Sequence, residues 1–219
     1  MSRHRKEVRT PFVEPLWVLP VPRDRIAIVY DGMLESQSTM NSSGSISPNS
    51  EYLDLHYSRP SQCVIVRFRR WIQPIEYVDE VYYRRSVDPD YSKVRFSDDL
   101  VTCSDLVVCS SSPMAFLNLA RWNSGHTGSD WDRICALHLP SGRLAPVLDR
   151  GNLRVPSGYV GGWIASLIDA DATGTILTCR VALALPTGPD SQTIQYMVSE
   201  VDLSTGGLNT LVQLSTPFG

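Results

Sequence analysis

Hydrophobic and polar residues alternate along most of this chain in short runs with a period of two. In residues 63–71, Val64, Val66 and Phe68 fall on one side, and Arg67 and Arg69 on the other. Such alternation is typical of a half-buried β-strand. No stretch keeps the 3.6-residue period of an amphipathic helix, so the sequence predicts an all-β fold. Similar runs, separated by turn-forming residues, predict further strands at residues 25–30, 75–84, 94–96, 106–109, 115–122, 163–168 and 175–185.

One stretch of the pattern occurs twice. Residues 134–148 read I-C-A-L-H-L-P-S-G-R-L-A-P-V-L, and residues 198–212, 64 positions later, read V-S-E-V-D-L-S-T-G-G-L-N-T-L-V. The two align without a gap. Each predicts two strands joined by a tight turn, in which Gly142 or Gly206 supplies the positive φ of a bulged type I turn. Asp202 is placed to accept hydrogen bonds from the amides of the second turn.

The L-x-[S/T]-G-x-L hairpin of both copies resembles the outer strands of WD-repeat and related β-propellers, in which a hydrophobic-aspartate-leucine stretch precedes the turn. The resemblance covers residues 105–214. The Gly-His and Trp-Asp signatures are absent at their usual places, because Trp131-Asp132 precedes the third strand of its unit. The resemblance implies propeller-like antiparallel sheets in a small or incomplete propeller, because a closed ring needs about four to eight blades. A second copy of the chain would complete such a ring, and a β-sandwich or barrel is the alternative.

Composition places the chain among ordinary globular proteins. It has 219 residues, 42% of them hydrophobic and 20% charged, with a net charge of −3. Residues 1–23 read as a basic tail and an extended proline-rich segment, and residues 24–219 as a single all-β domain with a serine-rich loop at 35–50. The N-terminus lacks a secretory h-region, no apolar run reaches the length of a membrane span, and the five cysteines show no C-x-x-C spacing. We therefore expect a cytoplasmic protein without a cofactor.

Two groups of residues could be read as metal sites. D-A-D-A-T-G at 169–174 starts like a calcium loop, but its twelfth position is Arg180, which favours a hairpin turn. His126, Asp130 and Asp132 share a loop and have the ligand types for a divalent metal, although a solvated turn is the commoner arrangement. Neither a G-x-S-x-G elbow nor a phosphate-binding glycine loop occurs.

A basic and aromatic cluster offers a nucleic-acid interpretation. Guanidinium groups beside aromatic rings suit phosphate contact and base stacking. A tight turn after residue 73 would place Glu80 opposite Arg67, however, so the positive charge is matched by carboxylates and we do not expect nucleic-acid binding. The cluster consists of Arg67, Arg69, Arg70, Trp71, Tyr82, Tyr83, Arg84 and Arg85.

These patterns favour a non-enzymatic scaffold that binds a protein partner through loops at one rim, 123–132 and 186–193. The expected contact residues are Trp122, His126, Asp130, Trp131 and Asp132, and Trp131 is expected to be the most exposed tryptophan. A homo-oligomer is also compatible with the sequence. The alternative function is a hydrolase that uses the loop carboxylates Asp130, Asp132 and Asp169, with or without a metal.

Overall fold

The chain folds into antiparallel sheets in which the strands follow one another in chain order. The computed structural model describes residues 17–19, 27–30, 33–36, 50–73, 76–88, 91–97, 101–122, 129–189 and 191–214. The first sheet has three strands: β1 (Trp17–Leu19), β2 (Ala27–Tyr30) and β3 (Met33–Ser36). The other three sheets have four strands each. The predictions for residues 1–16 and 37–49 lie outside the described residues.

The first four-stranded sheet contains β4 (Ser50–Ser58), β5 (Cys63–Gln73), β6 (Glu76–Arg85) and β7 (Ser92–Lys93). The second contains β8 (Val101–Val108), β9 (Met114–Trp122), β10 (Ser129–His138) and β11 (Arg143–Asp149). The third contains β12 (Gly161–Ala170), β13 (Ile176–Gly188), β14 (Ser191–Asp202) and β15 (Leu208–Gln213). A 3-10 turn, η2 (Arg150–Asn152), begins the link between the last two sheets.

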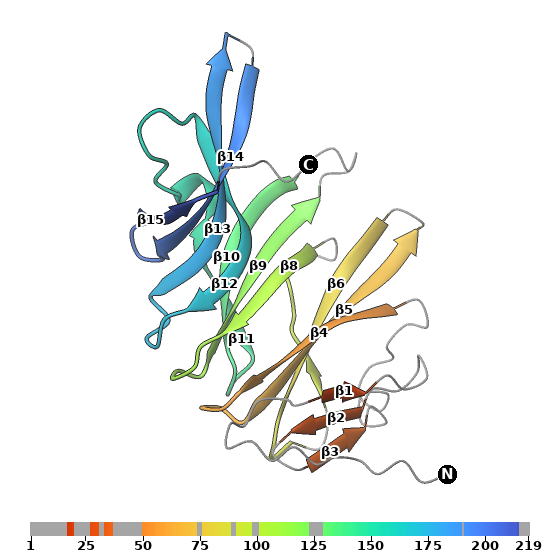
Figure 1. Ribbon diagram of the computed structural model, residues 1–219. Coiled ribbons are helices and arrows are strands. Elements are labelled where there is room, and N and C mark those ends of the chain that lie inside the picture. The colour runs from red at the N-terminus through yellow and green to blue at the C-terminus, as the bar shows by residue number, and fades with distance from the viewer. Residues whose placement is uncertain are drawn as a thin grey trace, which may run out of the picture.

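The four-stranded sheets are packed side by side, like successive blades (Figure 1). Strand β8 is the first strand of the second four-stranded sheet. It lies against β4 and β6 of the sheet before it and against β12 of the sheet after it. We call β4, β8 and β12 the inner strands. An all-β fold of propeller-like antiparallel sheets is therefore confirmed. The described residues form no α-helix, and their short 3-10 helix is too short to cross a membrane.

Both copies of the repeated stretch form the predicted hairpin. Gly142 and Gly206 have φ values of 66° and 69°, and their N–H groups donate to the carbonyls of His138 and Asp202 at 2.8 Å. Asp202 accepts the N–H of Ser204 at 2.8 Å, as expected for the second turn. The two hairpins also share a feature that the sequence did not show, a β-bulge at the equivalent position. The β10–β11 ladder has a bulge after Ile134 and the β14–β15 ladder has one after Val198, again 64 positions later.

Two apolar clusters fill the spaces between the sheets. One lies between the first two four-stranded sheets and includes Ile65, Val81, Leu117 and Leu137. The other lies between the last two and includes Phe116, Ile134, Leu177 and Val181. The period-two alternation explains this arrangement, because neighbouring residues of β9 and β10 point to opposite faces of the same sheet.

A second bulge recurs in the inner strands. The ladders β4–β5, β8–β9 and β12–β13 shift register between Tyr52 and Asp54, between Cys103 and Asp105, and between Ile164 and Ser166. After each bulge, Asp54 pairs with Arg67, Asp105 with Asn118, and Ser166 with Arg180. The three sheets are therefore structurally equivalent at their inner edges, although their sequences here have little in common.

The structure corrects two details of the sequence interpretation. Glu80 lies opposite Phe68 and not Arg67, because Gln73 pairs with Glu76, which moves the register by two positions, and the bulge between Trp71 and Gln73 moves it back by only one. The predicted loop 186–193 is mostly strand, since β13 continues to Gly188 and β14 begins at Ser191. The pair β13–β14 thus projects as a long hairpin at the top of Figure 1.

The D-A-D-A-T-G stretch is a hairpin turn, as predicted. Asp171 accepts the hydroxyl of Thr173 and the N–H groups of Thr175 and Ile176, the latter two at 2.7 and 2.8 Å. The Thr173 hydrogen bond first, and the backbone hydrogen bonds with it, hold the pKa of the Asp171 carboxyl well below the usual value. The five cysteines are all buried and unpaired.

Candidate functional site

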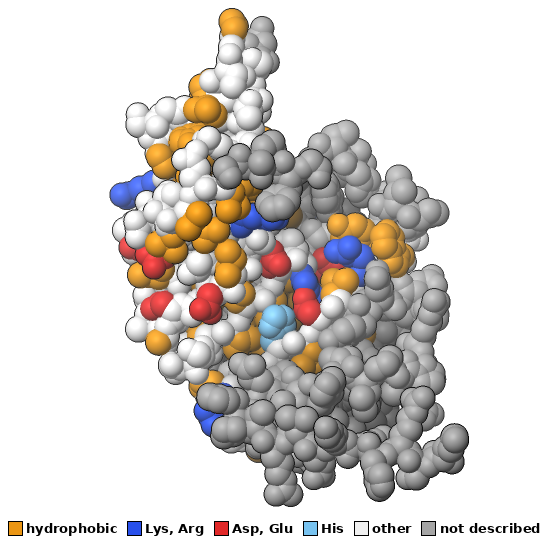
Figure 2. All heavy atoms as spheres, viewed as in Figure 1, with side chains coloured by type: hydrophobic (Ala, Val, Ile, Leu, Met, Phe, Trp, Pro, Cys, Tyr) orange, Lys and Arg blue, Asp and Glu red, His pale blue; other side chains and the backbone are white. Residues whose placement is uncertain are grey.

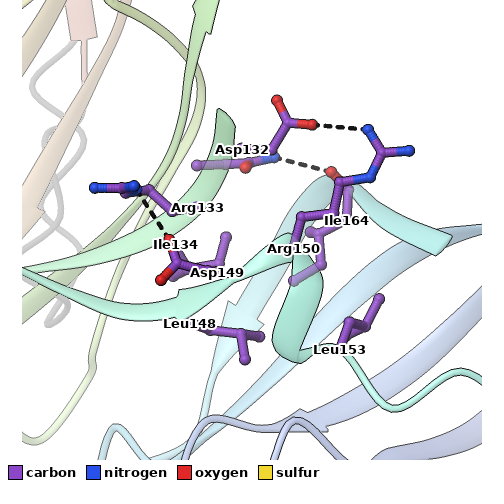
Figure 3. A pocket seen from close by; sticks show the side chains of 9 residues that line it. Asp132, Arg133, Ile134, Leu148, Asp149, Arg150, Leu153 and Ile164 are labelled. Carbon is purple, nitrogen blue, oxygen red and sulfur yellow. Dashed lines mark hydrogen bonds and ion pairs between the residues drawn. The ribbon is translucent and has the colours of Figure 1, made fainter. Parts of the chain in front are cut away.

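An open cleft of about 500 Å³ separates the second and third four-stranded sheets at one end. Its sides come from the start of β10, from η2 and from the start of β12. A narrow inner part of about 20 Å³ continues down to Leu148 and Ile164, where the apolar cluster closes it (Figure 3). Trp131, Asp132, Asp149, Arg150, Gly161 and Gly162 border the open part.

Two arginines at this cleft are each held by one aspartate and one tryptophan. Arg150 Nη1 lies 3.0 Å from Asp132 Oδ2, and the Arg150 guanidinium carbon is 5.1 Å from the ring centre of Trp163. Arg133 Nε lies 3.1 Å from Asp149 Oδ1, and its guanidinium carbon is 4.2 Å from the ring centre of Trp131. Figure 3 shows both ion pairs.

These paired charges remain accessible to a partner. The side chains of Arg150 and Asp149 are 48% and 51% exposed, whereas those of Asp132 and Arg133 are more covered. Exposed ion pairs contribute little to stability, at most about 1 kcal/mol. Arginine and tryptophan are the residue types that most often dominate binding energy at protein interfaces. Both ion pairs lie within the second four-stranded sheet and the link that follows it, so they contribute little to holding that sheet against the next.

The predicted contact residues are only partly placed by the structure. Asp132 and Trp131 border the cleft, whereas the side chains of Trp122 and Asp130 and the whole of His126 lie outside the described residues. Trp131-Asp132 lies within the third strand of its sheet, β10, and does not precede it. Trp131 is half-buried against the apolar cluster, so the expectation that it would be the most exposed tryptophan is wrong. Among the described tryptophans that residue is Trp71, with 38% exposure.

Sequence reasoning missed Arg133, Asp149, Arg150 and Trp163 as members of the site. Asp149 and Arg150 follow the first copy of the repeat directly, in a link that was read only as a turn. Their place directly after an outer strand could have identified Asp149 and Arg150, because a residue at the end of an outer strand lies beside the start of the next sheet.

A second group of polar residues connects the first two four-stranded sheets near their inner strands. Arg67 donates to both oxygens of Asp54 and, through Nη1, to the carbonyl of Cys103. Burial would raise the pKa of Asp54, but hydrogen bonds from His56 and Arg67 outweigh it and leave the pKa below the usual value. Asp79 accepts the N–H of Cys103 at 2.8 Å and pairs with Arg69 at 3.1 Å. Burial nevertheless raises the pKa of Asp79.

In the first four-stranded sheet, most arginines of the basic cluster form ion pairs with nearby carboxylates. Arg69 pairs with Asp79, Arg70 pairs with Glu80 at 3.0 Å, and Arg85 pairs with Asp88 at 2.7 Å. Arg69 also covers the ring of Tyr77 at 3.8 Å. Glu80, which was expected opposite Arg67, thus pairs with Arg70, and Arg67 pairs with Asp54 instead.

The described part of the chain contains no group of three histidine, cysteine or acidic side chains that could hold a metal ion. Asp169 accepts the N–H of Ala170 at 2.8 Å and lies on β12, whereas Asp132 lies on β10 and pairs with Arg150. The two described carboxylates of the hydrolase hypothesis thus have separate partners.

Comparisons with known proteins show likeness to two peptidase structures. Tricorn protease matches with a TM-score of 0.41 and 14% identity over 93% of this chain and 18% of its own. Prolyl oligopeptidase B from Galerina marginata matches with a TM-score of 0.42 and 10% identity over 86% of this chain and 29% of its own. This chain thus spans less than a third of either. No protein-family model and no curated protein sequence matches it.

Proposed function

We propose that the chain is a non-enzymatic binding module of the WD-repeat-like propeller type. In this proposal a protein partner inserts an extended segment into the cleft between the second and third four-stranded sheets. The observation that carries it is the pair of arginine–tryptophan contacts at the mouth of the cleft, each closed by an aspartate.

The chemistry of the cleft defines the kind of segment it would accept. Arg150 offers guanidinium N–H donors, Asp149 offers carboxylate acceptors, and Leu153 and Val155 give the open part an apolar wall. A short peptide with one apolar side chain flanked by polar groups satisfies all three. Backbone approach is eased on the β12 side by Gly161, where even an added Cβ would meet no atom within 4 Å.

The test selects peptides from a displayed random library against the full chain and measures their affinity for variants. Arg150→Ala should weaken binding by ~10-fold or more, because truncated interface arginines commonly cost 1 to 2 kcal/mol or more. Arg59→Ala, an exposed arginine in the β4–β5 turn, is the matched control and should leave affinity unchanged. Selected peptides that bind Arg150→Ala as well as the original chain would refute the proposal.

The hydrolase hypothesis predicts a different result. A divalent metal should then raise the melting temperature of the protein, and the increase should disappear in the double variant Asp130→Ala, Asp132→Ala. Under the binding proposal the metal leaves the melting temperature unchanged, and peptide affinity responds to Arg150 instead.

A further inference from the structure

The first two four-stranded sheets are joined by two hydrogen bonds to one residue of the inner strand β8. Arg67 of β5 donates to the carbonyl of Cys103, and Asp79 of β6 accepts the N–H of Cys103 at 2.8 Å. The Asp79 side chain is completely buried there, and Arg69 pairs with it at 3.1 Å. At Cys103 the open edge of β8 is therefore closed by the sheet before it.

The junction between the second and third four-stranded sheets keeps the first of these hydrogen bonds. Asn118 of β9 donates through Nδ2 to the carbonyl of Ile164 in β12, at 3.1 Å. Asn118 corresponds to Arg67, because each pairs with the residue that follows the inner-strand bulge of its own sheet. Ile164 corresponds to Cys103, because each precedes the bulge of its inner strand. The two junctions can therefore be compared residue by residue.

By this comparison Asp132 is the equivalent of Asp79. In β6, Asp79 comes two residues before the partner of Arg67. In β10, Asp132 comes two residues before the partner of Asn118. The N–H and C=O of one strand residue point to the same edge, so the N–H of Ile164 faces the second sheet as its carbonyl does. The register therefore places Asp132 where an acceptor for this N–H is expected.

The Asp132 carboxylate bonds to the link between the sheets instead. Its Oδ2 accepts a hydrogen bond from Arg150 Nη1 at 3.0 Å. The residue across from Asp132 in β9 is Ala120, whereas the equivalent residue of β5 is an arginine, so no charge on the neighbouring strand holds this carboxylate inward. Asp132, Arg150 and Ile164 all line the narrow inner part of the cleft (Figure 3). Asp132 thus has a second partner in the same space, the N–H of Ile164.

We propose that the segment bound in the cleft carries a carboxylate that takes Arg150 from Asp132, and that Asp132 then turns to the N–H of Ile164. This inference rests on the proposed function of the cleft. The Asp132–Arg150 pair is partly exposed and therefore weak, and each member of the pair keeps a partner after the exchange. On the face shown in Figure 2 the described acidic and basic side chains are intermixed, so the contacts of Arg150 and not a field of one sign select the carboxylate. An acidic side chain and a C-terminus both supply this group.

The first test changes the peptides selected against the full chain. Each peptide is synthesised with its acidic residues changed one at a time to the corresponding amides, and separately with an amidated C-terminus. One of these changes should weaken binding by ~10-fold, because it removes a charge-assisted hydrogen bond to Arg150, and its position identifies the source of the carboxylate. The neutralised peptide should bind Arg150→Ala as well as it binds the original chain. Peptides that depend on Arg150 but on none of these carboxylates would overturn this inference and leave the proposed function standing.

The second test changes the competing carboxylate of the protein. Asp132→Asn keeps the size of the side chain but removes its charge, so the selected peptides should bind ~2–5-fold tighter. Asp149→Asn makes the same charge change at the same cleft but leaves the Asp132–Arg150 pair in place, and should bring no gain. Weaker binding to Asp132→Asn, or an equal gain in both variants, would refute the exchange. Circular dichroism confirms that each variant is folded, and the peptide changes decide on the original chain if Asp132→Asn is not.

Discussion

Gly206 and the carbonyl oxygen of Asn152 meet so closely that a Cβ on Gly206 would stand 2.0 Å from that oxygen. The contact joins the turn of the last hairpin to η2, and the N–H of Arg154 donates to the carbonyl of Gly206 at 2.8 Å. In the first copy of the repeat, a Cβ on Gly142 would stand 1.9 Å from the Tyr83 hydroxyl. Each turn glycine thus serves both the turn and the packing of the turn on a neighbouring segment.

Gly206→Ala should destabilise the protein by ~2 kcal/mol or more, because the alanine needs φ of 69° and also meets a backbone atom. Thermal unfolding should show a decrease of ~4–8 °C. Gly151→Ala in η2 is the control, since a Cβ there meets no atom within 4 Å. Equal melting temperatures for the two variants would contradict this account of the turn.

Asn118→Ala should cost about 1–3 kcal/mol in urea unfolding, because it leaves the Ile164 carbonyl without its donor between two sheets. Asn118→Asp keeps the shape of the side chain but removes the N–H, and should be at least as harmful. Asn209→Ala removes an exposed hydrogen bond to Glu200 and should cost less than about 0.5 kcal/mol. A similar loss for Asn118→Ala and Asn209→Ala would show that the link between the sheets has no special role.

Asp105→Asn should change the dependence of stability on pH. Burial raises the pKa of Asp105 in the folded chain, although the N–H of Leu167 donates to it at 3.3 Å. The folded state therefore retains the proton longer than the unfolded state, and the free energy of unfolding decreases as pH rises from the usual value of 3.8 through the raised one. In Asp105→Asn this decrease should be missing. Urea unfolding at several acidic pH values measures it, and parallel curves for both proteins would contradict the prediction.

The five cysteine thiols should react slowly with a disulfide reagent while the protein is folded. Burial raises the pKa of Cys63 and Cys179 to about 12 and that of Cys135 to about 11, so little thiolate forms at pH 8. Guanidinium chloride should expose all five to rapid reaction. A thiol that reacts at its full rate in the native protein would be inconsistent with this burial.

The outer hairpins and the inner strand β12 were predictable from the sequence, whereas the other two inner strands, β4 and β8, were not. The hairpins have local turn chemistry at Gly142 and Gly206 and unbroken alternation before the turn. Strand β4 was missed, and β8 was found only in fragments, because the bulges at Leu53 and Ser104 interrupt the alternation. Asp-Leu follows the bulge at residues 54–55 and 105–106, and this short repeat was the available signal.

The candidate site was predicted less completely than the fold. Trp131 and Asp132 could be proposed because they share a loop-like stretch of sequence. Arg150 and Trp163 belong to other elements, and only the packing of the second sheet on the third brings them to the same cleft. Packing between sheets depends on distances that no periodicity encodes, so the approach of Arg150 to Trp163 required the structure.

The bulges in the inner strands have a consequence for how such a protein could be lengthened by tandem duplication of one sheet. The second four-stranded sheet accepts a hydrogen bond from its predecessor at the Cys103 carbonyl and donates one to its successor through Asn118, so this unit is modular. A gene in which residues 101–158 were duplicated in tandem should encode a longer array whose added module joins its neighbours through bonds already in use. Lengthening by duplication would then require no newly evolved junction.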